Sequence, residues 1–415
     1  MKKNVLKIIV ENINFFEDNK FEIDFTNQLQ VTNHDSTHPY YHLESRIYLA
    51  KYLAFVGVNA SGKTTIIEIL SAVFDFYFYN RPFNERILSK FFRGSPLKTT
   101  FIYEYNAKVF KIISIITNHN EADVILFEDD NDYYINNYSI VEEVIYEKRL
   151  NKSTVKSSLL VDGFVEIFRR SKLDEKTKVF LGENESMINI LNHKTKQTVV
   201  SVIENGISLK KIPLPPLGIK IDLEIVKYLD PSIKEIKEIK LSNLKERKIT
   251  NNISYLIEFE GGKEIEVSLR QLNNVLSMGT LKGMRTFFEV KEVLRSGGYY
   301  LIDEIEAHLN RTIILDIIKL FEDHETNPNN ATLIFTTHYT EILDAFIRND
   351  QIIYIHRNGK YEIKTTNYSS LSKRNELKRS DVYFADTFNL GTAISYKNFL
   401  NMKKLFILTS KDKNE

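Results

Sequence analysis

The segment from 57 to 65 has the residue types and spacing that bind the phosphates of a nucleotide. It reads GVNASGKTT, the complete pattern of a P-loop: a glycine, four residues, then Gly-Lys-Thr. Glycines let the backbone curl so that its N–H groups point at the phosphates, Lys63 reaches the β- and γ-phosphates, and the Thr64 hydroxyl can bind Mg²⁺. We therefore expect ATP and Mg²⁺ as cofactors, with nucleotide contacts from Gly57, Asn59, Ala60, Ser61, Gly62, Lys63, Thr64 and Thr65.

A phosphate loop also needs an acid to hold the metal and a group to activate water. Two adjacent acids, Asp303 and Glu304, follow an apolar run at 299–302. Asp303 at the end of a strand could reach Mg²⁺, and Glu304 could orient or deprotonate the attacking water. His338 follows a second apolar run at 332–335, where it could touch the γ-phosphate and sense its loss. An ordinary acidic turn and a structural histidine are the alternative interpretations.

A second small-residue loop, VLSMGTLKG at 275–283, also reads as a phosphate-binding helix start. Its candidate contacts are Ser277, Gly279 and Thr280. Because the loop at 57–65 already fits phosphate better, this second loop needs another explanation.

The elements that must position these residues follow from apolar spacing. The run at 52–56 predicts a strand, and TTIIEILSAVF after the P-loop predicts a helix. The runs at 299–302 and 332–335 predict buried parallel strands, whose carboxyl ends would face one crevice. The segment 98–117 predicts a hairpin, 118–139 a loop-edged strand pair, and 253–269 a hairpin that turns at Gly261 and Gly262.

The order of these motifs resembles that of ABC-type ATPases: P-loop, LSMGT, LIDEIE, then FTTH. The opening LKIIVENINFFEDNKFEIDF and the wording NASGKTT are similar to the SMC and OLD-like branch. The resemblance is greatest to bacterial AAA-type ATPases of the abortive-infection, AbiL-like kind, whose relatives serve as ATPase subunits of anti-phage systems. It covers most of the chain and is weakest between residues 152 and 220.

The resemblance implies an α/β fold: an ABC-type P-loop head with a mixed central sheet and an N-terminal antiparallel β-lobe. It also implies that Ser277, Gly279 and Thr280 complete the site of a partner chain, so that ATP joins two heads. Three features depart from the family pattern. No glutamine occurs between residues 65 and 150 to form a Q-loop, and the first hairpin turn reads NINFF where many relatives have an arginine. The usual LHP after the acidic motif is HLN here, and His308 is a candidate at the dimer seam.

For domain organisation we expect a discontinuous head at 1–150 and 221–415, with an inserted helical lobe at 151–220. Helices are expected at 157–173 and 184–193, and the lack of sustained heptads argues against a long coiled coil. The charge run at 234–248 is interpreted as a solvated helix or strand face. His34, His38 and His42 are spaced four apart, but Pro39 favours a loop over a metal site.

The composition of the chain argues against two kinds of chemistry. Net charge is +1 and there is no cysteine, so neither a global basic field nor cysteine chemistry is available. The N-terminus lacks signal-peptide character, and no apolar run is long enough for a membrane helix, so we expect a cytoplasmic protein.

We predict an ATP-gated homodimer or higher oligomer that acts as a switch for a separate effector, a nuclease or toxin. One alternative is an SMC-like DNA-binding ATPase in DNA repair. The other is an OLD-like nuclease, although about 75 residues after His338 are too few for its Toprim domain.

Overall fold

The structure is a computed structural model of the 415-residue chain. It describes residues 2–31, 39–44, 46–79, 81, 96–118, 138–151, 154, 159–191, 199–202, 222–240, 253–268, 271–372, 377–390 and 396–411. The expected strand pair at 118–139 lies almost entirely outside the described residues, as do His34 and His38.

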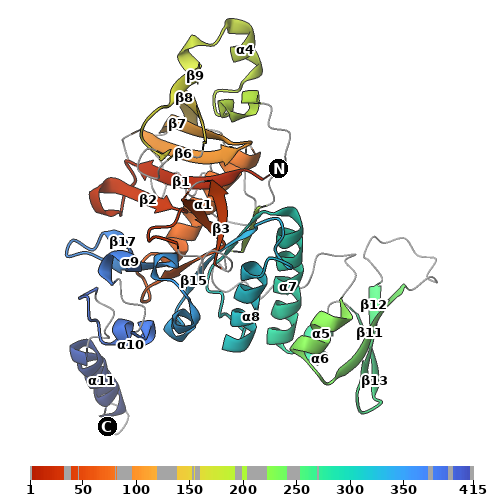
Figure 1. Cartoon of the computed structure of the whole chain (residues 1–415). Coiled ribbons are helices and arrows are strands. Elements are labelled where there is room, and N and C mark those ends of the chain that lie inside the picture. The colour runs from red at the N-terminus through yellow and green to blue at the C-terminus, as the bar shows by residue number, and fades with distance from the viewer. Residues whose placement is uncertain are drawn as a thin grey trace.

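A mixed six-stranded sheet forms the centre of the fold (Figure 1). The first five strands in its spatial order are parallel, and the last is antiparallel to its neighbour. The order is β10 (Val199–Val202), β14 (Tyr299–Ile302), β15 (Thr332–Thr337), β5 (Tyr52–Val56), β16 (Ile352–Arg357) and β17 (Ile363–Asn367). The strands predicted at 52–56, 299–302 and 332–335 are thus confirmed as neighbours in one sheet.

Both faces of this sheet are covered, which explains why its inner strands β14 and β5 are buried throughout. Leu53 and Phe55 of β5 pack in one core with α1 (Lys63–Tyr79). The alternate residues Tyr52, Ala54 and Val56 pack in a second core with α7 (Met278–Ser296) and α8 (Arg311–Glu322). The period-two alternation of a strand therefore joins two cores through one central layer.

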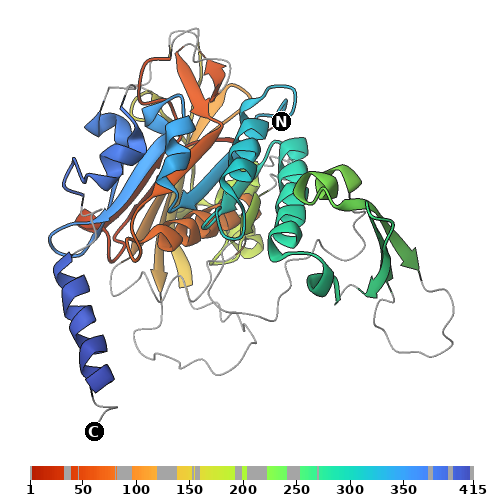
Figure 2. The same ribbon diagram turned by 90° about the horizontal axis from the view of Figure 1, so that it is seen from below.

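An antiparallel six-stranded sheet covers α1 on its far side (Figures 1 and 2). Its order is β2 (Lys20–Asp24), β1 (Asn4–Glu11), β6 (Leu97–Tyr105), β7 (Lys108–Asn118), β8 (Tyr138–Arg149) and β9 (Val165–Arg169). This is the predicted N-terminal β-lobe, including the hairpin at 98–117. A separate pair joins β3 (Tyr40–Glu44) to β4 (Ile47–Ala50).

A third, three-stranded sheet lies beside the start of α7. It contains β11 (Ile233–Lys240), β12 (Ile253–Phe259) and β13 (Glu264–Ser268), with α5 (Leu223–Leu229) and α6 (Leu272–Val275) against it. The turn at Gly261 and Gly262 is confirmed: the Gly262 N–H donates to the Phe259 carbonyl at 2.8 Å. The described part of the charge run is a strand on which Lys234 and Lys237 are exposed, so the solvated-face interpretation is confirmed there.

The remaining helices are short or peripheral. They are α4 (Glu175–Phe180), α9 (Tyr368–Leu371), α10 (Arg379–Phe384) and α11 (Tyr396–Lys411). The longest described helix, α7, has 19 residues, in keeping with the expectation of no long coiled coil among them. No helix in the described part combines the length and the apolar character that crossing a membrane requires.

Residues 159–191 correct one secondary-structure expectation. The sequence pattern predicts a helix over 157–173, but strand β9 occupies Val165–Arg169 and pairs with β8, with Val144 opposite Arg169. The helix expected at 184–193 is a short 3-10 helix, Met187–Leu191. Tertiary contacts explain why 165–169 forms a strand: the open edge of β8 supplies backbone hydrogen-bond partners, which the local sequence pattern does not reveal. The division into a head and an inserted lobe stays a prediction.

Candidate nucleotide-binding and hydrolysis site

The P-loop connects the end of β5 to the start of α1, as its sequence context predicts. Two glycines are required by close packing. A Cβ on Gly57 would lie 2.4 Å from the Ile355 carbonyl oxygen, and one on Gly62 would lie 2.6 Å from the Ile363 side chain. Gly62 also has φ +112°, which only glycine adopts readily. The hairpin of β16 and β17 therefore fixes the loop from outside.

Lys63 is the first residue of α1 and is buried, with 6% of its surface exposed. Its ammonium donates to the carbonyls of Gly57 at 2.8 Å and Val58 at 3.0 Å, and lies 3.4 Å from Nδ1 of His338. Burial lowers the pKa of Lys63, while nearby carboxylates, Glu304 first among them, oppose that shift. The cation is thus held inside the loop, where phosphate binds in this motif.

Thr64 and Asp303 meet where β14 ends. The Thr64 hydroxyl donates to Oδ2 of Asp303 at 2.6 Å, and the Thr336 hydroxyl donates to Oδ1 at 2.6 Å. Asp303 is only 2% exposed, so these two hydroxyls fix its carboxylate. A hydroxyl and a carboxylate oxygen are the ligand types that Mg²⁺ prefers. The residues present therefore fit Mg²⁺, which would screen phosphate charge when bound.

Glu304 and His338 form the polar end of the site. His338 follows β15 directly, and its Nε2 lies 3.5 Å from Oε1 of Glu304. Glu304 is 48% exposed and has φ +49°, a left-handed conformation that is strained for a non-glycine residue. Its backbone N–H donates to the Thr336 hydroxyl at 2.7 Å. In this conformation, the accessible carboxylate of Glu304 lies beside the His338 ring.

The second loop is a helix start, as predicted. Ser277 is the N-cap of α7, and its hydroxyl accepts from the Thr280 N–H at 3.0 Å. A Cβ on Gly279 would lie 2.9 Å from the carbonyl oxygen of His308. Among the described residues, no hydrogen bond or ion pair joins Ser277, Gly279 or Thr280 to the P-loop of the same chain. These three residues therefore form a separate group.

A family comparison matches most of this architecture. The family described as "AAA domain, putative AbiEii toxin, Type IV TA system" matches residues 53–344, from β5 through His338. This chain belongs to that family. It thus contains an AAA domain, a P-loop class whose members use ATP and Mg²⁺. No curated protein matches the sequence.

Among solved structures, the chain is similar to "the recombination mediator protein RecF-ATPrS in RecFOR pathway". The identity is 10% and the TM-score 0.33, over 88% of this chain and 98% of that one.

Sequence reasoning missed three side chains that shape the site of this AAA domain. Thr336 holds both Asp303 and the Glu304 backbone. A Glu306 carboxylate oxygen accepts from the His338 backbone N–H. Arg357 donates from Nε to the Ala60 carbonyl at 3.2 Å, across 297 residues of sequence. Glu306 could have been found from the repeated acid in DEIE; the other two carried no local signal.

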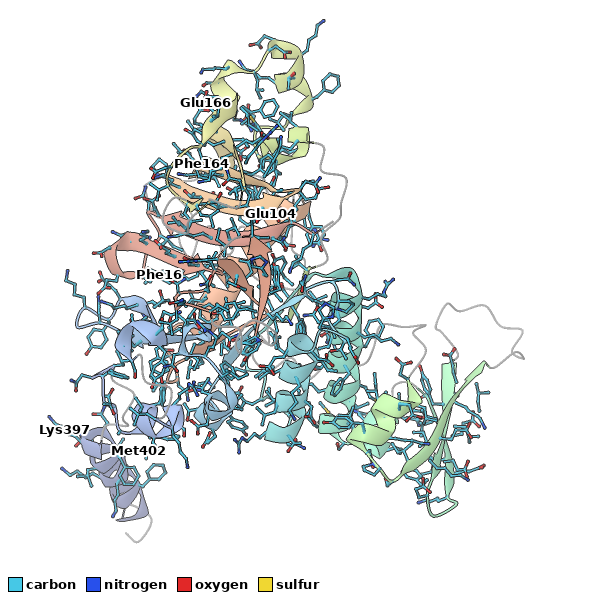
Figure 3. The ribbon with its side chains drawn as sticks, in the orientation of Figure 1. Phe16, Glu104, Phe164, Glu166, Lys397 and Met402 are labelled. Carbon is cyan, nitrogen blue, oxygen red and sulfur yellow. The ribbon has the colours of Figure 1, made fainter. Side chains whose placement is uncertain are left out.

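The first hairpin of the chain, β1 and β2, also reaches the P-loop region. The Ile363 N–H, beside Gly62, donates to the Phe15 carbonyl at 2.6 Å. Phe16, labelled in Figure 3, is buried next to this strand. The turn without arginine therefore serves as packing for the hairpin that holds the P-loop.

Two remaining candidates lie elsewhere. His308 is exposed, has φ +64° and contributes its carbonyl beside Gly279. His42, for which the neighbouring residues predict a loop, instead lies on β3, where its ring is tilted against that of Tyr48, with 5.0 Å between the centroids. Within the described residues, no group of three or more His, Cys, Asp or Glu side chains could hold a metal ion.

Proposed function

We propose that this chain hydrolyses ATP with Glu304 as the base for the attacking water. The observation that carries this proposal is the approach of Glu304 to His338 at 3.5 Å, beside the Lys63 ammonium. An exposed carboxylate can accept a proton from water at the γ-phosphate, while His338 contacts that phosphate. Lys63 and Asp303 then hold the charged groups in place, so catalysis depends mainly on positioning and charge.

We further propose that ATP gates the pairing of two heads. Ser277, Gly279 and Thr280 would complete the site of a second chain. Two features support this assignment: the capped start of the long helix α7 offers N–H groups to an anion, and none of the three residues bonds to the described P-loop of its own chain. Loss of the γ-phosphate would then loosen the pair.

At the level of biology, we propose a switch subunit in a bacterial anti-phage system that controls a separate effector, a nuclease or toxin. The family description, which names a toxin of a toxin–antitoxin system, supports a defence context. The resemblance of the sequence motifs to abortive-infection ATPases also supports it.

The first test is Glu304→Gln in the full chain, with the exposed Glu325→Gln as a matched control. Glu304→Gln should bind ATP and still pair, while turnover falls by about 10²-fold or more, as is typical of a lost general base. The control should behave like the wild type. Normal turnover in Glu304→Gln would show that the base has been assigned wrongly.

The second test is Ser277→Arg. It should leave ATP binding intact and abolish both ATP-dependent pairing, measured by light scattering, and turnover. If Ser277→Arg pairs and turns over ATP at wild-type levels, the loop at 275–283 has no role beyond capping α7. The same assays with added DNA test the alternative of an SMC-like repair ATPase. Strong stimulation of ATP turnover by DNA would favour that alternative over the switch subunit. Cleavage of DNA, RNA or tRNA by the pure chain would contradict the separate effector.

A further inference from the structure

A pocket opens where the β-lobe meets the start of the central strands. Its volume is about 520 Å³, within the range of roughly 300–1,000 Å³ that is usual for small-molecule sites. Three chain segments, at 2–4, 104–107 and 329–330, build it. The polar residues that line it are Lys2, Asn4, Glu104, Asn106, Asn329 and Asn330. Figure 3 labels Glu104 on this side of the β-lobe, near the N-terminus marked in Figure 1.

This pocket is separate from the nucleotide site. Asn329 and Asn330 precede β15, whereas His338 follows it. The six residues of β15 rise about 3.3 Å each, so the two sites lie roughly 20 Å apart at opposite edges of the sheet.

Lys2 is the cation of the pocket. Its ammonium donates to the Asn330 carbonyl and, at 3.2 Å, to the Thr332 hydroxyl. It also lies over the ring of Tyr299, 4.6 Å from the centroid, and near that of Tyr41 at 5.3 Å. All these partners are neutral, and no carboxylate of the described residues forms an ion pair with Lys2. A partly buried cation without a counter-charge is unusual, because burial favours charges that are paired.

Glu104 provides the opposite charge on another wall. Its carboxylate accepts from the Asn4 side chain at 2.7 Å and from the Ala107 N–H at 2.7 Å. Asn4 is oriented in turn by the Tyr41 hydroxyl, which donates to its Oδ1 at 2.9 Å. The pocket thus contains the Lys2 ammonium and the fixed Glu104 carboxylate, which do not form an ion pair with each other, together with several asparagine side chains.

We propose that this pocket binds a small polar molecule that carries a carboxylate or phosphate, which pairs with Lys2, and a hydrogen-bond donor, which faces Glu104. The ligand supplies a counter-charge that the described residues do not provide to Lys2. Its donor explains why an acid lines the same cavity.

The titration behaviour of both groups agrees with this geometry. Burial lowers the pKa of Lys2 to about 7, and burial raises the pKa of Glu104. An anion beside Lys2 favours the charged form, so binding must raise the pKa of Lys2. The charge of Lys2 therefore reports directly on the pocket.

The test uses the full chain with ¹³C-methylated lysines, followed by NMR. The resonance of Lys2 is identified by its loss in Lys2→Arg. Acetate, inorganic phosphate and glycine are added separately at constant ionic strength, with exposed Lys176 as the internal control. At least one of these probes should raise the pKa of Lys2 by about one unit, a tenfold change in proton affinity, and leave Lys176 unchanged.

The acetate and phosphate arms distinguish a carboxylate ligand from a phosphate ligand. Glu104→Gln should weaken glycine binding severalfold and leave acetate binding unchanged, because only glycine presents an ammonium donor. If none of the three probes moves the Lys2 resonance, or if Lys2 and Lys176 move equally, the pocket is not an anion site and the proposal fails. ATP turnover does not enter this readout, so the result is independent of the proposed ATPase cycle.

Discussion

Replacing Thr336 with valine tests how Asp303 and the backbone of Glu304, the proposed base, are held. Thr336 is fully buried, and its hydroxyl makes two contacts: it donates to Asp303 and accepts from the Glu304 N–H. Valine keeps the branched shape and the β propensity of threonine, but it removes both contacts. The substitution therefore isolates the hydroxyl.

The expected magnitude follows from these two contacts. A hydrogen bond to a charged group contributes about 1.5–3 kcal/mol, and a buried donor left without a partner costs about 1–3 kcal/mol. The Glu304 N–H is only partly buried and can regain water, so the lower end applies to it. We expect Thr336→Val to reduce the free energy of unfolding by roughly 2–4 kcal/mol. We also expect a higher Mg²⁺ requirement for turnover, because Asp303 loses one of the two hydroxyls that orient it.

Thr340→Val is the matched control. Thr340 is 1% exposed, and its hydroxyl has no hydrogen-bond partner among the described residues. The same substitution there should change the free energy of unfolding by less than about 1 kcal/mol, since no contact is lost. Urea unfolding followed by circular dichroism, and turnover against Mg²⁺ concentration, provide the measurements. Equal urea midpoints for the two variants would refute the role assigned to the Thr336 hydroxyl.

Two further predictions concern packing and pH. Gly279→Ala places a methyl group 2.9 Å from the His308 carbonyl oxygen and should destabilise the chain by about 1–3 kcal/mol, whereas Gly261→Ala, in open space, should be nearly neutral; equal thermal midpoints would contradict the contact. For Lys2, the pKa falls from 10.5 to about 7 on folding. At pH values between these two, the unfolded chain therefore binds a proton at Lys2 that the folded chain has lost. Between pH 7 and 10 the wild type should therefore gain stability relative to Lys2→Met, by up to about 1.4 kcal/mol per pH unit; a pH-independent difference would exclude the shift.

Local sequence pattern predicts well where the side chains of this site lie. The P-loop, the acids after β14 and the histidine after β15 are each determined by a short segment whose apolar run fixes a strand. Because parallel strands bring their carboxyl ends to one edge, the apolar runs alone place Asp303 and His338 near Lys63. Ser277 is likewise recognisable as a helix start, since a serine before a helical pattern is a usual N-cap.

Contacts between distant segments cannot be predicted in this way. Thr336 looks like any β-branched residue of a buried strand, and only the structure shows its hydroxyl between two acids. Arg357 meets Ala60 across most of the chain. The spacing within β9 favours a helix, and its pairing with β8 is decided by an open sheet edge and not by its own residues.

The turn that carries Glu304 shows why these distant contacts matter for function. Glu304 and His308 both have positive φ, at +49° and +64°, and such conformations cost about 1–3 kcal/mol each. The turn persists because other elements hold it: Thr336 bonds the Glu304 N–H, and the Thr336 carbonyl accepts from the Ile305 N–H at 3.1 Å. On the other side, the His308 carbonyl packs against Gly279. The segment that carries Glu304, the proposed base, is therefore in contact with both β15 and the second loop of the same chain. A displacement of either neighbour must be met by a change in the strained turn, since packed interiors transmit small shifts instead of absorbing them.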